Sequence, residues 1–299
     1  MQIIDGQLVA SILKKSLKEK VEYRVQLGHR PPHLCAILIG EDPASHAYIN
    51  YKIMACAEVG FKSSLLKFDN QVSEEFILDK ISEINSDGQI DGLIVQLPLP
   101  KRISVNKIIE HTDPNKDVDG FHPINIGRMV KGIDAVLPAT PAGILLLLEH
   151  YDIKTEGKNC VVIGRSQIVG GPMAILMSLN HKLGNATVVH CHSKTKNLKE
   201  LTLQADIIIS AVGRPKLITA DMVKEGVVII DVGTTRVKDE TKKSGFSLSG
   251  DVDFINVAPK CQYITPVPKG VGPMTIASLL NNTLLLANKR LGLSLPSKI

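Results

Sequence analysis

The sequence of 299 residues lacks several features that would identify whole classes of protein. It has no long run of lysine and arginine and no aromatic residues interleaved with basic ones, although its net charge is +5. Surfaces that bind nucleic acid are typically rich in both. It also has no apolar stretch close to the roughly 18 residues of a membrane span. We therefore expect neither a nucleic-acid partner nor a membrane segment.

Paired cysteines are also lacking. The five cysteines are odd in number and show no C-x-x-C spacing, so they predict no disulfide framework. Cys35 and Cys160 lie inside apolar, strand-like runs, where a thiol typically serves as a small core residue. The first residues, MQIIDGQLVASILKK, have no basic leader before an apolar block. These observations predict a cytoplasmic protein with reduced thiols.

Continuous apolar runs alternate with helix-compatible stretches along the chain. Strands that are buried on both faces are typical of parallel sheets, so the predicted fold class is α/β. The length favours two domains. The turn-rich segment 111–143 is the predicted crossing between them, with Thr140 as the N-cap of the next helix and Pro141 at its first position. The predicted strands lie in 34–40, 92–97, 160–164, 186–191, 206–213 and 227–233.

The stretch CVVIGRSQIVGGPM, residues 160–173, departs from the glycine fingerprint of a dinucleotide-binding loop. The pattern G-x-G-x-x-G would need glycine where Ser166 stands. Arg165 lies at the tip of this loop. An acid about 20 residues later, which would hold the ribose hydroxyls of NAD, is also missing. The segment HSKT, 192–195, stands there, and its hydroxyl and ammonium groups, with the Arg165 guanidinium, favour the 2′-phosphate of NADP. The alternative is an ordinary strand-to-helix turn.

A second group of polar residues lies in the first half of the chain. In DPASHAYINYK, Asp42 or Ser45 would cap a helix that carries Tyr48 and Lys52 on one face. On a solvated face this pair is a lysine packed over a tyrosine. In a cleft, burial would lower the pKa of the lysine and make it a base.

Other polar residues taken singly have ordinary structural explanations. Gln96 ends a predicted strand, and the acids of DPNKDVDGF are typical of helix caps or solvated turns. His190 and His192 alternate along a strand, but no third ligand follows at a useful spacing, so we expect no metal site.

Taken together, these motifs follow the order and spacing of one family. They are AYINYK, VQLPLP, KDVDGFHPINIGR, PATPAG, VVIGRSQIVGGPM, HSKT, IDVGTTRV, GDVDF and ITPVPKGVGPMTIASLL. Over almost its whole length the chain resembles the bifunctional methylenetetrahydrofolate dehydrogenase and methenyltetrahydrofolate cyclohydrolase family. The resemblance implies an N-terminal α/β folate-binding catalytic domain, residues 1–140 plus 272–299, and a C-terminal Rossmann-type NADP-binding domain, residues 141–271. A cleft is expected between them.

The resemblance also implies roles for individual residues. Lys52 matches the catalytic lysine, Tyr48 the family's tyrosine, and Gln96 the glutamine that holds the lysine. Asp119 matches the acid that binds the pterin ring. Further substrate-binding positions are Val95, Leu97, Pro268, Gly270, Gly272 and Pro273, and the cofactor-binding positions are Gly164, Arg165, Ser166, Ser193 and Thr234.

Two residues depart from the family pattern. Lys269 replaces a glycine, which would introduce strain if the backbone there has a positive φ; otherwise its charge would meet the acidic tail of the substrate. Gly171 stands where relatives often have arginine or alanine.

The implied activity is oxidation of 5,10-methylenetetrahydrofolate by NADP+, followed by hydrolysis of the methenyl product to 10-formyltetrahydrofolate. This places the chain in one-carbon metabolism and purine biosynthesis, acting on tetrahydrofolate derivatives with or without a polyglutamate tail. A homodimer is the implied assembly. Two alternatives stay open: a family member with only one of the two activities, and a non-catalytic NADP-binding regulator.

Overall fold

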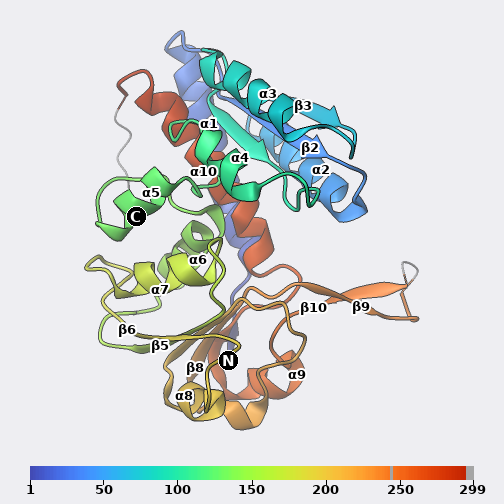
Figure 1. The fold of residues 1–299 in the computed structure, drawn as a ribbon. Helices are drawn as coiled ribbons and strands as arrows, with labels where there is room; N and C mark the ends of the chain where they lie inside the picture. Colours follow the sequence, from blue (N-terminus) through green and yellow to red (C-terminus); the bar gives the residue numbers. More distant parts are fainter. Residues whose placement is uncertain (243–244, 294–299) are drawn as a thin grey trace. The chain divides into compact units, whose positions relative to one another are not determined.

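The computed structural model describes residues 1–242 and 245–293 (Figure 1). The chain forms two compact units. The three-stranded unit comprises Ser11–Ala139 and the segment that begins at Ile276, and the six-stranded unit comprises Met1–Ala10 and Thr140–Thr275. The last residues of the range expected for the first domain, 294–299, lie outside the described residues. Within the described ranges, no helix is both long enough and apolar enough to cross a bilayer.

The three-stranded unit is built on a parallel sheet of order β3-β2-β4. Its strands are β2 (His33–Ile39), β3 (Lys62–Phe68) and β4 (Gly92–Val95). Its helices are most of α1 (Gly6–Gln26), α2 (Pro43–Glu58), α3 (Glu74–Ser86), α4 (Val105–His111), α5 (Pro123–Val130) and most of α10 (Val271–Lys289). The runs at 34–40 and 92–97 predicted β2 and β4. The sequence of β3, KSSLLKF, is half polar and no residue of this strand is fully buried, so no apolar run revealed it.

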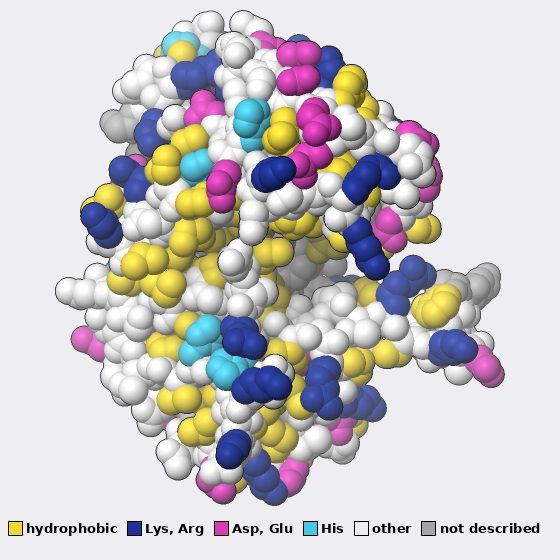
Figure 2. Space-filling view, in the orientation of Figure 1, with side chains coloured by type: hydrophobic (Ala, Val, Ile, Leu, Met, Phe, Trp, Pro, Cys, Tyr) yellow, Lys and Arg dark blue, Asp and Glu magenta, His cyan; other side chains and the backbone are white. Residues whose placement is uncertain are grey.

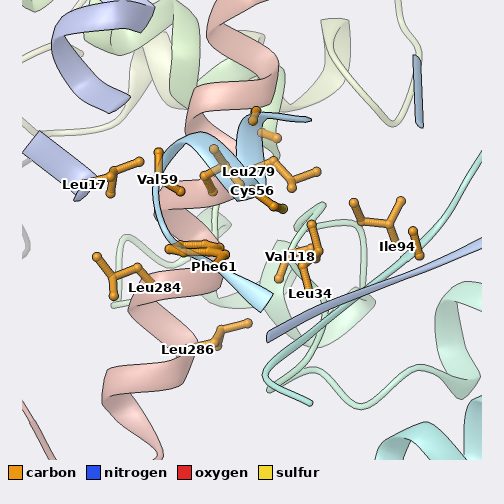
Figure 3. Packing of buried hydrophobic residues seen from close by; sticks show 14 of the residues in the cluster. Leu17, Leu34, Cys56, Val59, Phe61, Ile94, Val118, Leu279, Leu284 and Leu286 are labelled. Atoms are coloured by element: carbon orange, nitrogen blue, oxygen red, sulfur yellow. The ribbon is translucent and has the colours of Figure 1, made fainter. Parts of the chain in front are cut away.

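The central strand β2 has a core on each of its faces because successive side chains of a strand point in opposite directions. Leu34, Ala36 and Leu38 pack with residues of α1, α2 and α10, whereas Cys35, Ile37 and Ile39 pack with residues of α3 and α4. Figure 3 shows part of the first cluster, including Leu279 and Leu284. Burying one such side chain contributes about 1.5–3 kcal/mol, so the two clusters hold the ends of β2 and β4 firmly in place.

Local signals begin α2 where the sequence predicted. Asp42 is the N-cap and accepts a hydrogen bond from the backbone N–H of Ser45 at 2.8 Å, and Pro43 occupies the first turn. Proline suits this position because the first N–H groups of a helix have no intrahelical acceptor. The helix therefore starts at a fixed residue, which fixes the register of Lys52 further along it.

The six-stranded unit contains a parallel sheet of order β1-β11-β8-β7-β5-β6. Its strands are β1 (Gln2–Ile3), β5 (Asn159–Ile163), β6 (Thr187–Cys191), β7 (Ile207–Ser210), β8 (Val227–Asp231) and β11 (Cys261–Ile264). Its helices are α6 (Ala139–His150), α7 (Gly170–Ser178), α8 (Leu198–Gln204) and α9 (Phe254–Val257), with 3₁₀ turns at Ala220–Met222 and Ala258–Lys260. The order of strands reverses between β5 and β7. A hairpin of β9 (Thr235–Lys238) and β10 (Phe246–Ser249) extends from this unit (Figure 1).

Two details of the sequence-based prediction were wrong. Thr140 is not an N-cap, because α6 already begins at Ala139; its hydroxyl instead lies 2.9 Å from the hydroxyl of Thr275. The strand at 186–191 is not buried on both faces, because β6 forms the edge of the sheet and Thr187, Val189 and His190 are exposed.

Candidate active site

Lys52 and Gln96 are brought together by the three-stranded unit. Lys52 lies on α2 and only 6% of it is exposed. Its Nζ donates a hydrogen bond to Oε1 of Gln96 at 3.1 Å. Gln96 follows β4 directly, and its own Nε2 donates to the carbonyl of Leu97 at 2.7 Å. The contact with Leu97 fixes the orientation of the amide, since a carbonyl only accepts and the amide nitrogen must therefore face it. The amide oxygen is then turned toward Nζ of Lys52, which can donate to it in either protonation state.

Burial and the neighbouring groups act on the pKa of this lysine in opposite directions. Burial lowers the pKa of Lys52, and the nearby groups of Asp119 and Cys56 oppose that shift. Burial raises the pKa of Asp119 to about 6, with Lys52 lowering it and Asp117 raising it further. A carboxyl group and an amine with pKa values moved toward neutrality are typical of sites that transfer protons.

Tyr48 and the residues around Gln96 complete this part of the site. Tyr48 lies one turn before Lys52 on α2, is 43% exposed, and has its pKa raised by partial burial. Val95 ends β4. Val95 and Leu97 line, with Asp119, a cavity of about 30 Å³. The predicted substrate residues of the first half of the chain therefore gather at the carboxyl end of β4.

Asp117 is a residue whose importance the sequence did not reveal. Its Oδ1 accepts from the backbone N–H groups of Gly120 and Phe121 at 3.0 and 3.2 Å. Its Oδ2 accepts from the N–H of His122 at 2.8 Å and from Nδ2 of Asn125 at 2.9 Å. Four hydrogen bonds to one carboxylate fix the turn that carries Asp119. The signal was the D-x-D-G pattern, which we had interpreted as a cap or a solvated turn.

The predicted cofactor residues lie at the carboxyl end of the six-stranded sheet. Gly164, Arg165 and Ser166 follow β5, Ser193 follows β6, and Thr234 follows β8. The N–H of Gly164 donates to the carbonyl of Cys191 at 2.9 Å, which ties the first loop to the end of β6. Arg165, Ser193 and Thr234 are exposed. This edge is where open α/β sheets bind their ligands.

Close packing explains the glycines of the loop after β5. Gly164 has φ +115°, and a Cβ there would lie 2.4 Å from the carbonyl oxygen of Ala211. A Cβ on Gly170 would lie 2.0 Å from the carbonyl oxygen of Gly164. Ser166 replaces the glycine of the usual fingerprint, and its Oγ accepts from the N–H groups of Val169 and Gly170 at 3.1 and 3.4 Å. The serine thus satisfies N–H groups at the start of α7.

The remaining predicted substrate residues lie in the six-stranded unit, in the turn after β11 and in the first turn of α10. They are Pro268, Gly270, Gly272 and Pro273. Lys269 in this turn has φ +80°, so the first of the two interpretations of this lysine holds: it occupies a backbone conformation that favours glycine. Its carbonyl accepts from the N–H of Gln7 at 3.1 Å.

In the described ranges, no three His, Cys, Asp or Glu side chains gather in a way that could hold a metal ion. His190 instead makes a hydrogen bond between Nε2 and the carbonyl of Gly164 at 2.7 Å.

Comparison with known families matches both parts of the chain. A family model described as tetrahydrofolate dehydrogenase/cyclohydrolase, catalytic domain, matches residues 4–119. A second, described as tetrahydrofolate dehydrogenase/cyclohydrolase, NAD(P)-binding domain, matches residues 138–291. The bifunctional protein FolD of Cytophaga hutchinsonii is 58% identical over 284 residues, which cover 95% of this chain and 98% of that protein.

Solved structures give the same result. The bifunctional FolD methylenetetrahydrofolate dehydrogenase/cyclohydrolase of Campylobacter jejuni is 45% identical with a TM-score of 0.91, covering 97% of this chain and 99% of that one. The methylenetetrahydrofolate dehydrogenase-cyclohydrolase of Trypanosoma brucei, solved with NADP and an inhibitor, is 34% identical with a TM-score of 0.91, covering 97% and 98%.

Proposed function

The chain belongs to the tetrahydrofolate dehydrogenase/cyclohydrolase family, and from that premise we propose that it catalyses two successive reactions on one folate. In the first, 5,10-methylenetetrahydrofolate loses a hydride to NADP+ and becomes the methenyl cation. In the second, water attacks the methenyl carbon and the ring opens to 10-formyltetrahydrofolate. The observation that carries this proposal is the buried Lys52 amine held by Gln96, because hydration requires a base and this amine has a lowered pKa.

The residues at the carboxyl end of the six-stranded sheet fit NADP. Gly164 and Gly170 leave no room for a Cβ, so the loop after β5 is a compact cradle of the kind that admits a pyrophosphate. We propose that Gly164, Arg165, Ser166, Ser193 and Thr234 hold the cofactor, with Arg165 and Ser193 at the 2′-phosphate. Lysine, arginine and histidine side chains gather on this unit in Figure 2. When bound, NADP+ supplies the hydride acceptor.

In the proposed hydration step, the chain's own residues bind the ring and move one proton. Asp119 accepts hydrogen bonds from the amino-pyrimidine edge of the pterin. The neutral amine of Lys52 takes the proton from the attacking water. Gln96 keeps Nζ in one orientation through its 3.1 Å contact. Tyr48, which lies on the same helix as Lys52, positions the folate.

Further substrate contacts are proposed on both units. Val95 and Leu97 border the ring, and Pro268, Gly270, Gly272 and Pro273 belong to the same substrate-binding set. The proposed domains are residues 1–140 plus 272–299 for folate and 141–271 for NADP; within the first range, Met1–Ala10 and residues 272–275 belong to the six-stranded unit.

The test replaces Lys52 by methionine, which keeps much of the stem's volume and removes the amine. Cyclohydrolase activity should fall by about 10² to 10⁴, the contribution typical of general acid–base catalysis. Dehydrogenase activity should persist, so the methenyl product should accumulate. The absorbance of this product measures its accumulation. Lys80→Met, at a half-buried lysine paired with Glu83 outside the proposed site, is the matched control and should keep both activities. Equal loss of both rates in a folded Lys52→Met that still binds folate would assign the lysine to substrate positioning.

We further propose the cellular setting and the assembly. The five cysteines are free and buried, which fits a reducing cytoplasm. The product, 10-formyltetrahydrofolate, is a formyl donor of the kind that purine biosynthesis consumes, and polyglutamylated folates are included among the substrates.

A homodimer is supported by the β9–β10 hairpin, whose Phe246 and Leu248 are each 42% exposed. Light scattering of the purified protein tests the dimer. Separate assays of the two products distinguish an enzyme with both activities from a single-activity enzyme and from a regulator.

A further inference from the structure

Asp251 is a fully buried carboxylate that lies outside the set of predicted site residues. It follows β10, and its side chain accepts three hydrogen bonds, all from one neighbouring strand and the loop after it. Oδ2 accepts from Oγ of Ser210 at 2.9 Å and from the N–H of Val212 at 2.8 Å. Oδ1 accepts from the N–H of Arg214 at 2.8 Å. The carboxylate therefore holds the end of β7 and the loop 211–214 in one conformation.

A second buried carboxylate holds Asp251 itself. Asp231 ends β8, and its Oδ1 accepts from the N–H groups of Asp251 and Gly233 at 2.9 and 3.0 Å. Its Oδ2 accepts from the N–H of Val252 at 3.0 Å. Burial raises the pKa of Asp231 to about 7, and the neighbouring Asp251 adds to that shift. The two side chains thus tie together the segments after β7, β8 and β10.

Two glycines are needed for this arrangement. A Cβ on Gly233 would lie 2.1 Å from Oδ1 of Asp251, and a Cβ on Gly250 would lie 2.0 Å from Oδ2 of Asp231. Both contacts are far too short for a side chain. Burying charged groups has a large desolvation cost, and apolar residues of similar volume often stabilise a fold equally well. The network is therefore better explained by the loop geometry that it imposes than by stability.

The loop held by Asp251 borders the proposed cofactor cradle. Gly164 packs against this loop so closely that a Cβ there would lie 2.4 Å from the carbonyl oxygen of Ala211. The N–H of Ala211 in turn donates to the carbonyl of Ile163 at 2.8 Å. The strand order reverses between β5 and β7, and a dinucleotide lies across such a reversal. Ser193, proposed to bind the 2′-phosphate of the adenosine half, lies on the β6 side. The nicotinamide half therefore belongs on the β7 and β8 side, where Asp251 holds the loop.

We propose that Asp251, held by Asp231, is a positioning residue for the nicotinamide half of the cofactor. It acts through the backbone of residues 211–214 and touches no part of the cofactor. This inference rests on the proposed NADP site. An asparagine at position 251 would place an N–H₂ group against the N–H of either Val212 or Arg214, and these two donors repel, so the loop would leave its position.

The experiment measures binding to the full-length protein by calorimetry, with NADP+ and with 2′,5′-ADP, which carries only the adenosine half. Asp251→Asn should raise the Kd for NADP+ about tenfold or more and leave the Kd for 2′,5′-ADP within about twofold. Cyclohydrolase activity on methenyltetrahydrofolate should be retained. Asp253→Asn is the matched control: it makes the same change two residues away, at a side chain that contacts Asn256 and Lys216 but none of the residues 211–214. It should bind both ligands normally.

The binding data distinguish the proposal from a general structural role. Unchanged NADP+ affinity in Asp251→Asn would overturn the proposal, and so would an equal loss for both ligands, which would indicate a general structural role. If Asp251→Asn does not fold, Ser210→Ala decides, because it removes one of the three hydrogen bonds and adds no donor. A rise of about threefold in the Kd for NADP+ alone supports the proposal, and no rise overturns it. Failure of the unmutated protein to bind NADP+ would instead contradict the proposed function.

Discussion

Lys52 and Gln96 stand 44 residues apart in the chain and meet through a hydrogen bond of 3.1 Å, with the lysine Nζ as donor and Oε1 of Gln96 as acceptor. The amide is neutral, so it orients the amine without adding a negative charge that would raise the pKa of the lysine. Its other end is fixed on the carbonyl of Leu97 at 2.7 Å. The pair therefore combines a fixed position for Nζ with a pKa that burial has lowered.

Replacing this amide by a carboxylate should shift the pH dependence of the hydrolytic reaction. In Gln96→Glu a negative charge next to Nζ stabilises the ammonium form, so the pKa of Lys52 rises. Less neutral amine is then available at a given pH, and the rising limb of the cyclohydrolase pH profile moves to higher pH. The check is kcat/KM from pH 6 to 10, with the exposed Gln89→Glu as control. A profile that loses height without moving would contradict the titration of Lys52.

Asp119 should make folate binding pH-dependent. Its pKa is raised to about 6, so the carboxylate that we propose to pair with the pterin is lost as the pH falls through that value. Folate affinity should then decrease by up to tenfold for each pH unit below about 6. Asp119→Asn cannot titrate and should bind folate weakly at every pH, impairing both reactions while NADP+ binding survives. Equilibrium titrations from pH 5 to 8 test this, and normal folate affinity in the variant would show that the pterin lies elsewhere.

Arg165 should determine the preference for NADP+ over NAD+. A hydrogen bond to a charged group contributes about 1.5–3 kcal/mol, so Arg165→Ala should weaken NADP+ about tenfold and affect NAD+ much less. Arg236→Ala, on the β9–β10 hairpin of the same unit, is the control and should change neither. The measurement is kcat/KM with each cofactor. Equal efficiency of the unmutated enzyme with NADP+ and NAD+ would rule out a dedicated 2′-phosphate site.

The parts of the fold that the sequence predicted are those encoded by side-chain type. The strands β2, β5, β7 and β8 have continuous apolar runs because helices or loops cover both of their faces. The strand β3 is half polar and gave no such signal. The start of α6 was misplaced because its first residues, Ala139 to Pro141, contain two plausible beginnings, and only the folded chain shows which one is used.

The site was predictable to a different extent. The spacing of Tyr48 and Lys52 placed them on one face of a helix, but a contact across 44 residues follows from the parallel sheet and not from any local pattern. The sequence did not predict the structural roles of Asp117, Asp231 and Asp251, because their hydrogen-bond partners are mainly backbone N–H groups of loops. Every residue except proline carries such a group, so the sequence does not mark the residues that will supply it.

Lys269→Gly should stabilise the protein. Lys269 has φ +80°, a conformation that costs a residue with a side chain about 1–2 kcal/mol and costs glycine little. Glycine loses more backbone entropy on folding, by about 0.5–1 kcal/mol, so the expected gain in the free energy of unfolding is about 0.5–1 kcal/mol. The hydrogen bond from the N–H of Gln7 to the carbonyl at this position is preserved, because it involves only backbone. Urea denaturation at pH 7 measures the gain, with the exposed Lys101→Gly as a control that should lose stability, since Lys101 has no positive φ. If Lys269→Gly were no more stable than the unmutated protein, the ammonium group or the stem of Lys269 would have to make a compensating contact, and the strain argument for this turn would fail.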